Sequence, residues 1–471
     1  MNNISKKCVF IYVGQTDMDY MLAKKRDYGI KREPQIGSAY LAAVARERGV
    51  EPEILDFTVQ SHSKEWLADY VAALAPLFVG LYAAAAIKDN LVEFIEFLHQ
   101  RFPDLKIFVG GPDVYDFAAY LNAGADAYCL GEGERTMAEL IDYAAGKKRR
   151  NDIKGIAYKE GGQIISTPPR ELIENLDELP VPAWDKFDLN NYYDYHVFDM
   201  RPPHTSIMAS RGCPFCCAYC VSHKIWQGKY RLRSVGHVMR EIDYLVRELG
   251  VKTITFQDDI WSWQNDGWAK EICREIKNRK YDLTWRCILH PMSFLKSQKE
   301  ILPRMREAGC TSINTGLQSA SSKILRNIKR SPAEPEALAK LIEVMKQEDI
   351  LNSTAFIFGL PGETEETIEE SIRYSLKVKP TFTAFYVLSL LPGSDIWQAK
   401  EEGNYQSLPR ELLDKKCKEA SRRFFTNPAV VFNILKFMLK RNPAWPLLAL
   451  RHLDYMFDLS GLSKVKSKSI K

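Results

Sequence analysis

The sequence predicts an α/β protein with a doubly wound parallel sheet, a partial parallel barrel and a small helical region at the carboxyl end. Three observations support this prediction. Short apolar runs alternate with amphipathic stretches over residues 1–146, and a second such series begins at Ser206. With 471 residues, of which 46% are hydrophobic and 27% charged, the chain has the composition of a globular protein and room for about three domains.

The first series predicts a doubly wound sheet of the flavodoxin or Rossmann type over residues 1–146. Strands are expected at 9–12, 54–57, 78–82, 106–109 and 127–130, with helices such as 34–49 and 91–102 between them. Glycines stand at the carboxyl ends of these strands, where such sheets bind ligands: Gly14, Gly80, Gly110, Gly111, Gly131 and Gly133. Any doubly wound domain needs glycine in its strand-to-helix turns, so glycine alone leaves a ligand site and a plain turn equally open.

Residues 147–205 are expected to form a connector. Two short apolar runs flank Gly161-Gly162 and predict a β-hairpin over 153–157 and 164–167. Prolines then cluster at Pro168-Pro169 and Pro180-Val181-Pro182. This density of proline favours an extended linker over a third core.

The second series predicts a partial (β/α)6 barrel, similar to an open TIM barrel, over residues 206–395. Strands are expected at 206–209, 253–256, 283–289, 312–316, 354–358 and 383–388. Functional groups of parallel barrels gather at the carboxyl ends of the strands. Residues 396–471 are expected to form a basic helical region, since residues 401–471 hold 14 Lys and Arg against 7 Asp and Glu.

Three cysteines follow the first barrel strand with the spacing Cys213-x3-Cys217-x2-Cys220. A 4Fe-4S cluster is ordinarily held by four thiolates, so three would leave one iron open to another ligand. A structural zinc site needs a second ligand pair, which is missing here, and Cys216 could serve as a fourth ligand only with strained geometry. The length of the chain, with 10 cysteines and no secretory signal, argues against a disulfide framework.

This loop, with the aromatic Tyr219 before the last cysteine, resembles the signature of the radical S-adenosylmethionine (SAM) enzymes. The resemblance implies that Cys213, Cys217 and Cys220 hold a 4Fe-4S cluster whose open iron chelates SAM. It also implies that the backbone of Tyr219 faces the adenine. One electron, expected from flavodoxin or ferredoxin, then cleaves SAM to a 5'-deoxyadenosyl radical.

The later strand ends carry further features of that family. Asp258 and Asp259 follow the second strand, where relatives bind the amino group of SAM, although either residue could instead cap a helix. Gln318 and Ser319 stand where relatives use a Glu-Ser pair on the ribose and carboxylate; glutamine keeps an acceptor but loses the charge. Gly359 follows the fifth strand and either lets the backbone approach the adenine or forms a tight turn.

The segments 34–42, 110–113 and 131–136 resemble the cobalamin-binding domain that precedes the radical domain in one large subclass, and the whole resemblance covers roughly residues 8–395. It implies cobalamin contacts from Gly14, Gln15, Gly80, Gly110, Gly111, Gly131, Glu132 and Gly133. The Asp-x-His-x-x-Gly motif is absent and Asp113 stands where relatives commonly carry His. Cobalamin with its lower base detached and no protein ligand to cobalt is therefore expected. The alternative is a domain kept as a scaffold without the cofactor.

The resemblance implies a radical SAM enzyme that transfers a methyl group, with cobalamin, to an unactivated carbon or to phosphorus. A radical cyclase or rearrangement enzyme and a non-catalytic iron-sulfur protein are the alternatives. Only Cys8 and Cys129 lie in residues 1–146, which excludes the transfer RNA methylthiotransferases because these carry three cysteines there. The expected substrate is a small or lipid-like molecule, and no nucleic acid is expected.

Two segments bear on membrane contact. Residues 70–87 carry no charge, but Pro76 and Gly80 divide them into the end of a helix and a buried strand. Apolar runs at 424–425, 430–437 and 445–450 alternate with basic groups such as Lys440-Arg441. Such helices either rest on anionic lipid or cover the exposed side of the barrel. The expected location is the cytoplasm, with weak membrane association through this basic region.

Overall fold

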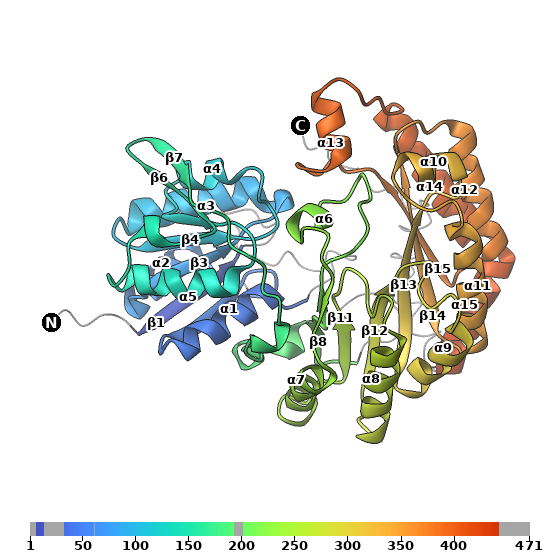
Figure 1. Ribbon diagram of the computed structural model, residues 1–471, viewed down its shortest axis with the longest axis horizontal. Coiled ribbons are helices and arrows are strands. Elements are labelled where there is room, and N and C mark those ends of the chain that lie inside the picture. The colour runs from blue at the N-terminus through green and yellow to red at the C-terminus, as the bar shows by residue number, and fades with distance from the viewer. Residues whose placement is uncertain (1–5, 14–32, 61, 193–200, 442–471) are drawn as a thin grey trace. The chain divides into compact units, whose positions relative to one another are not determined.

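The computed structural model describes residues 6–13, 33–60, 62–192 and 201–441. These divide into two compact units (Figure 1). The first contains the described residues up to 192 together with 201–206 and 236–252, and the second contains 207–235 and 253–441. Gly14, Gln15 and the segment 445–450, which the sequence analysis singled out, lie outside the described residues.

The first unit is built on a seven-stranded sheet with the order β2-β1-β3-β4-β5-β6-β7. Its parallel part consists of β1 (Lys7–Tyr12), β2 (Glu51–Asp56), β3 (Phe78–Tyr82), β4 (Lys106–Gly110) and β5 (Ala127–Cys129). The chain begins in the middle of the sheet and winds to both sides, since Val9 pairs with Glu53 on one side and Val79 on the other. The predicted doubly wound sheet is confirmed.

Helices cover both faces of this sheet (Figure 1). They are α1 (Ile36–Glu47), α2 (Lys64–Leu74), α3 (Lys88–Arg101), α4 (Phe117–Asn122) and α5 (Gly133–Ala144). The helices α1 and α5 pack together on one face. On the other, α2, α3 and α4 enclose a core that includes Leu67, Phe94 and Tyr120. Burying side chains of this size stabilises the fold by about 1.5–3 kcal/mol each.

The predicted hairpin is present, but it extends the first sheet instead of standing in the connector. β6 (Ile156–Glu160) pairs antiparallel with β5 and with β7 (Gln163–Ser166). Gly161 and Gly162 both have positive φ, 57° and 83°, as a two-residue hairpin turn of the primed type requires. The hairpin thereby covers the edge that β5 would otherwise expose.

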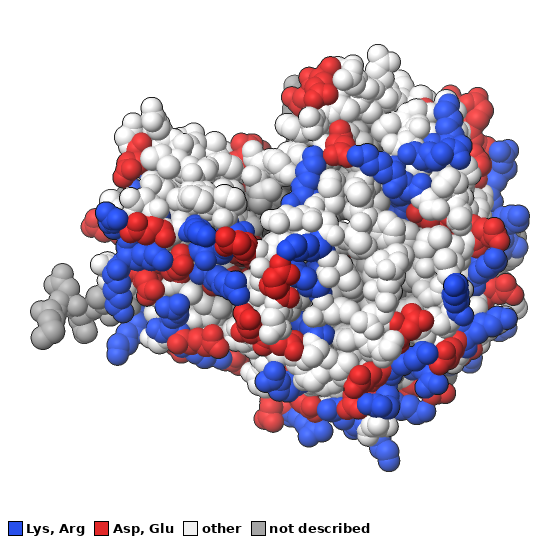
Figure 2. Space-filling model, viewed as in Figure 1, with Lys and Arg blue, Asp and Glu red and all other residues white. Residues whose placement is uncertain are grey.

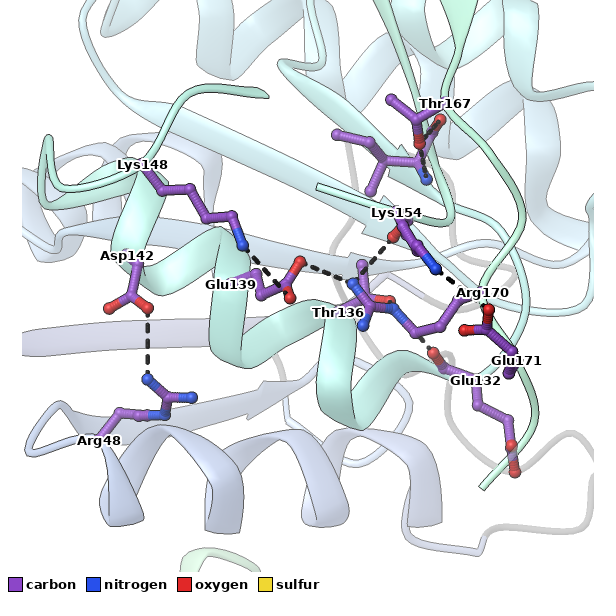
Figure 3. A network of polar contacts seen from close by, with 11 residues as sticks. Arg48, Glu132, Thr136, Glu139, Asp142, Lys148, Lys154, Thr167, Arg170 and Glu171 are labelled. Atoms are coloured by element: carbon purple, nitrogen blue, oxygen red, sulfur yellow. Dashed lines mark hydrogen bonds and ion pairs between the residues drawn. The ribbon is translucent and has the colours of Figure 1, made fainter. Parts of the chain in front are cut away.

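The connector after the hairpin is fastened to α5 by polar contacts (Figure 3). Arg170 donates to the carboxylate of Glu139 over 2.7 Å and to the hydroxyl of Thr136 over 2.9 Å. Farther along, the indole of Trp184 donates to Glu241 of α7 (Val235–Arg247) over 2.8 Å. These contacts hold the proline-rich segment to two helices of the first unit.

The second sheet has the strand order β15-β14-β13-β12-β11-β8. Its members are β8 (His204–Ile207), β11 (Thr253–Phe256), β12 (Thr284–Leu289), β13 (Cys310–Gln318), β14 (Leu351–Phe358) and β15 (Phe382–Val387). Neighbouring strands from β11 to β15 pair in parallel. Six strands in chain order, each near its predicted position, confirm the open parallel barrel.

Helices line the outer side of this sheet (Figure 1). The second unit contains α6 (Ser222–Ile225), α8 (Asp266–Asn278), α9 (Gln298–Glu307), α10 (Ser322–Asn327), α11 (Glu334–Gln347), α12 (Glu365–Val378), α13 (Asp395–Glu401), α14 (Arg410–Phe425) and α15 (Pro428–Arg441). Thr364 and Thr367 form a capping box at the start of α12. Among the described residues, no helix combines the length and the hydropathy needed to cross a bilayer.

Candidate functional site

The loop that carries the three predicted cluster cysteines is closed at its base by a short antiparallel ladder. β9 (Ser210–Arg211) pairs with β10 (Arg231–Leu232), one on each side of the loop. Gly212 has φ +94°, and a Cβ atom there would stand 2.0 Å from the carbonyl oxygen of Lys229. Only glycine permits this approach, so the loop leaves the sheet at a fixed point.

The cysteines of this loop differ in exposure. Cys217 is buried, Cys213 and Cys220 are half-buried, and Cys216 is exposed to solvent. Burial raises the pKa of Cys213 to about 12 and also raises the pKa of Cys220, so both are neutral thiols until a bound metal favours the thiolate. Within the described residues, no three His, Cys, Asp or Glu side chains surround a point where one metal ion could bind. The role of the three thiols as cluster ligands stays a prediction.

Arg330 lies behind the cysteine loop, and the sequence analysis did not identify it. Its guanidinium donates to the hydroxyl of Tyr219 over 3.1 Å and to the carbonyl of Gly316, at the end of β13, over 2.7 Å. It also lies 3.9 Å from the sulfur of Cys217 and forms an ion pair with Glu334. A buried cation therefore lies beside the sulfur of Cys217 and joins the cysteine loop to the end of β13.

The two carboxylates after β11 differ in their roles. Asp258 is buried and accepts hydrogen bonds from the backbone and the hydroxyl of Ser210, at the base of the cysteine loop. Burial raises its pKa to about 7, and its second oxygen has no hydrogen-bond partner among the described residues. Asp259 is exposed beside the loop. The alternative that either residue caps a helix is wrong, because Asn265 caps α8 by accepting from Trp268.

Gln318 and Ser319 end β13 in different environments. Gln318 follows a register shift, has φ +70°, and its buried carbonyl oxygen has no partner among the described residues. Ser319 is fully buried, and its hydroxyl contacts Ser371 and accepts from the backbone of Ser321. Gln318 is therefore free to bind a ligand, whereas Ser319 serves the core.

Gly359 sits in a turn that is held on both sides. It has φ +95°, and a Cβ atom would stand 2.9 Å from Leu413 of α14. The carboxylate of Glu363 accepts from the backbone of Gly359 and Leu360. Burial raises the pKa of Glu363 to about 7. The tight-turn explanation is enough to account for this glycine.

A pocket of about 160 Å³ opens at the carboxyl ends of the first sheet. It brings together five of the glycines that the sequence singled out: Gly80, Gly110, Gly111, Gly131 and Gly133. Phe10, Phe108, Gly37 and Ser38 also line it; of these, Gly37 and Ser38 belong to a segment that the resemblance covered. The sheet edge that was predicted to bind a ligand thus carries a mainly apolar pocket.

Two other residues of this region face elsewhere. Glu132 accepts a hydrogen bond from the backbone of Ile173 over 2.6 Å and so holds the connector. It does not line the pocket. Asp113 accepts from the hydroxyl of Tyr120 over 2.5 Å. Both carboxylates therefore stabilise the fold.

The pocket glycines are required for different reasons. At Gly80 a Cβ atom would stand 2.5 Å from the ring of Phe10, and at Gly111 2.2 Å from the carbonyl oxygen of Ala83. Packing alone explains these two. At Gly37 no atom lies within 4 Å of the position of a Cβ and φ is not positive, so the fold would accept a side chain there. Gly37 lines the pocket, so a side chain there would occupy space that a ligand could use.

Comparison with known proteins shows which family the chain belongs to. The model described as the radical SAM superfamily matches residues 207–375, and the B12 binding domain matches residues 31–141. An uncharacterized methyltransferase of Pyrococcus horikoshii is 30% identical over 369 residues, 78% of either chain. The chain belongs to the cobalamin-binding radical SAM enzymes.

Other members of this family resemble the chain in sequence or in fold. The anaerobic magnesium-protoporphyrin IX monomethyl ester cyclase of Rubrivivax gelatinosus is 27% identical, covering 84% of this chain and 74% of its own. The radical SAM methyltransferase TsrM of Kitasatospora setae, solved with cobalamin and a [4Fe-4S] cluster, has a TM-score of 0.68 at 19% identity, covering 86% of this chain and 76% of TsrM. OxsB, solved with aqua-cobalamin and SAM, has a TM-score of 0.70 at 14% identity. The match covers 95% of this chain and 72% of OxsB. These two structures share the two-domain fold.

This radical SAM enzyme uses a 4Fe-4S cluster, SAM and cobalamin. The unpartnered oxygens of Asp258 and Gln318, both beside barrel strand ends, leave acceptors free for SAM. The glycine-lined pocket of the first unit leaves room for a flat part of cobalamin. The residues of the two units therefore fit SAM and cobalamin respectively.

We expect Gly37→Leu to weaken cobalamin binding by about tenfold or more without destabilising the enzyme. Overfilling a packed space costs about 1–3 kcal/mol, whereas replacing glycine near the start of α1 raises helix propensity. The measurement is cobalamin retained after gel filtration, together with the melting temperature.

Gly236→Leu is the matched control. Gly236 is the second residue of α7, as Gly37 is of α1, and no atom lies within 4 Å of its Cβ position. It should keep full cobalamin binding. Equal retention by the two variants would contradict the assignment of the pocket.

Proposed function

We propose that this enzyme transfers a methyl group, with cobalamin, to an unactivated carbon or to phosphorus of a small molecule. The observation that carries the proposal is the union of a B12 binding domain with a radical SAM domain in one chain. The relative at 30% identity, a methyltransferase by name, supports it. When bound, the cluster and SAM supply a radical, and cobalamin supplies the methyl group.

The residues of the chain position these groups. The β9–β10 ladder and Gly212 fix the base of the cysteine loop, and Arg330 holds its far side against β13. Asp258 joins the base of the loop to the end of β11. Small shifts of reacting groups are costly in rate, so this bracing sets the geometry in which hydrogen is abstracted.

Product analysis tests the proposal. Two molecules of SAM are used per methylated product, one as the radical source and one as the methyl donor. With its true substrate, the reduced enzyme should therefore yield 5'-deoxyadenosine and S-adenosylhomocysteine in roughly equal amounts. Without substrate, 5'-deoxyadenosine alone is expected. Methyl-labelled SAM offered to candidate extracts would identify the acceptor.

A radical cyclase is the second candidate, because the Rubrivivax relative carries that name. The same assay separates the two functions. Turnover that forms 5'-deoxyadenosine and no S-adenosylhomocysteine would favour the cyclase. No 5'-deoxyadenosine under any condition would favour a non-catalytic iron-sulfur protein.

The expected partners are a cytoplasmic electron donor such as flavodoxin or ferredoxin and no nucleic acid. Cleavage of SAM consumes one electron, so a donor is required. Figure 2 shows Lys and Arg interspersed with Asp and Glu on the face in view. This pattern supports the absence of a nucleic-acid surface there, which would be a continuous basic stripe.

We also propose weak peripheral association with anionic membranes through α15. Val430 and Ile434 of this helix pack inward, at 1% and 5% exposure, whereas Phe432, Leu435 and Leu439 are 46–66% exposed. The exposed apolar side is flanked by lysines, as in helices that lie on lipid surfaces. A lipid-like substrate would suit such a location.

Liposome sedimentation tests this association. The enzyme should sediment more with anionic than with neutral vesicles, and Phe432→Glu should remove the difference. Leu391→Glu, at an exposed leucine outside α15, is the control and should behave as the unchanged enzyme. Equal sedimentation with both kinds of vesicle would exclude the proposal.

A further inference from the structure

A second pocket, of about 480 Å³, lies in the second unit beside the cysteine loop. Its lining residues follow β11, β12 and β13 in the chain. These three strands are neighbours in the barrel, so the pocket lies near their carboxyl ends. Phe215, between Cys213 and Cys217, forms part of its wall. The pocket is therefore bounded on one side by the loop that is predicted to hold the cluster.

Aromatic rings form one side of this pocket. Phe215 stacks on His290 with ring centroids 4.1 Å apart and an interplanar angle of 10°. Trp263 meets both rings edge-on, at 4.8 Å and 5.5 Å. Phe294 and Leu295 continue the apolar lining, and Leu295 is 49% exposed at the mouth. A flat apolar group would find aromatic surface here.

Two buried polar atoms of the lining lack partners. His290 is 6% exposed and Ser293 is 2% exposed. The Nε2 atom of His290 and the hydroxyl of Ser293 have no hydrogen-bond partner among the described residues. Buried polar groups are nearly always hydrogen-bonded, so two such atoms in one pocket point to a polar group of a ligand.

A backbone hydrogen bond fixes which nitrogen of His290 carries the proton, and so which kind of group His290 can bind. The backbone N–H of Met292 donates to Nδ1 of His290 over 3.2 Å, so Nδ1 carries no proton. Burial, helped by the charge of Arg330, lowers the pKa of His290 to about 2, so the ring is neutral. Its single proton is therefore on Nε2, which is a hydrogen-bond donor.

The charges next to the ring are already balanced. Glu334 lies 3.6 Å from Nε2, but its carboxylate is paired with Arg330 and accepts from the backbone of Ser331 over 3.0 Å. An ion pair this deeply buried leaves no net charge for a ligand to neutralise. The part of the pocket around the His290 ring therefore suits an uncharged group.

We propose that this pocket binds the substrate through an uncharged planar ring bearing a hydrogen-bond acceptor, with His290 as the residue that selects the acceptor. Calling the ligand a substrate rests on the proposed function; the binding itself does not. The ring lies against Trp263 and Phe215, and its carbonyl or similar acceptor takes the Nε2 proton.

The test uses two probes of nearly equal shape, 2-acetylnaphthalene and 2-ethylnaphthalene, of which only the first carries an acceptor. Binding to the reconstituted full chain is followed by ligand-observed NMR. A neutral hydrogen bond changes affinity by about 3- to 10-fold, so the acetyl probe should bind that much more tightly. His290→Phe keeps the stacked ring and removes the donor, so the two probes should then bind equally.

Leu295→Glu keeps the test decisive if His290→Phe does not fold. It changes only the exposed mouth and should weaken both probes to the same extent. No binding of either probe to the unchanged enzyme, or a preference for the acetyl probe that survives His290→Phe, would overturn the inference. Methyl transfer plays no part in this readout. Probe binding without any S-adenosylhomocysteine formation during turnover would overturn the proposed function alone.

Discussion

Cys213→Ala, Cys217→Ala and Cys220→Ala are each expected to abolish the 4Fe-4S absorption of the reconstituted enzyme, and with it all 5'-deoxyadenosine formation. Three thiolates are the fewest that can hold the cluster while one iron stays open to SAM. Loss of one leaves two corners of the cluster without a protein ligand. The measurement is iron and sulfide content and the visible spectrum after anaerobic reconstitution.

Cys216→Ala is the internal control for this series. Its thiol is exposed to solvent, unlike those of its three neighbours, so it should keep the full iron content and spectrum. If Cys216→Ala lost the cluster to the same degree, the ligand set would need to be reassigned. The loop itself should survive all four changes, since its base is held by the β9–β10 ladder.

Arg330→Met is expected to destabilise the protein by about 3–5 kcal/mol, because it leaves a buried carboxylate without its partner. The side chains of Arg330 and Glu334 are only 5% and 1% exposed. Burial already raises the pKa of Glu334, and Arg330 opposes that rise. The measurement is urea denaturation followed by tryptophan fluorescence.

The loss of stability should depend on pH in a defined direction. Without Arg330, the pKa of Glu334 in the folded state rises further above its unfolded value, so the folded state binds more protons. Stability then falls as pH rises above the unfolded pKa. The deficit of Arg330→Met should thus be smaller near pH 5 than near pH 7.

Lys340→Met is the matched control for Arg330→Met. Lys340 and Glu336 form a pair with the same four-residue spacing, but their side chains are 65% and 75% exposed. Exposed pairs of this kind contribute about 0.3–0.5 kcal/mol, so little change is expected. Equal effects of the two substitutions would show that burial of the Arg330 pair has no energetic consequence.

The sequence predicted the fold well because the strands follow simple rules. The predicted strands were apolar runs separated by helical patterns. The predicted bounds of β3 and β11 equal the observed ones, and those of the other strands differ by a few residues. The turn of the hairpin was predicted at the right glycines, but its first strand was placed three residues too early and the hairpin was assigned to the connector. Its pairing with β5 depends on which sheet edge is free, a tertiary property that local pattern does not carry.

The candidate site was predicted less completely, because residue type does not reveal burial. Glu132 and Ser319 have the right chemistry for a cofactor, yet the structure turns both toward neighbouring backbone and side chains. Arg330 was overlooked because an arginine followed four residues later by glutamate is usually an exposed helix pair. His290 follows β12 as a lone histidine, and only its stacking on Phe215 and its unpartnered nitrogen distinguish it.

The glycines of the first pocket bear on how cofactor loss could be recognised among homologues. A descendant that no longer bound cobalamin would still have to keep Gly80 and Gly111, because the sheet cannot pack without them. Selection at Gly37 would cease, since nothing in the fold opposes a side chain at that position. Substitution at Gly37 is therefore a mark by which vestigial domains could be separated from functional ones, whereas Gly80 and Gly111 are uninformative for that purpose.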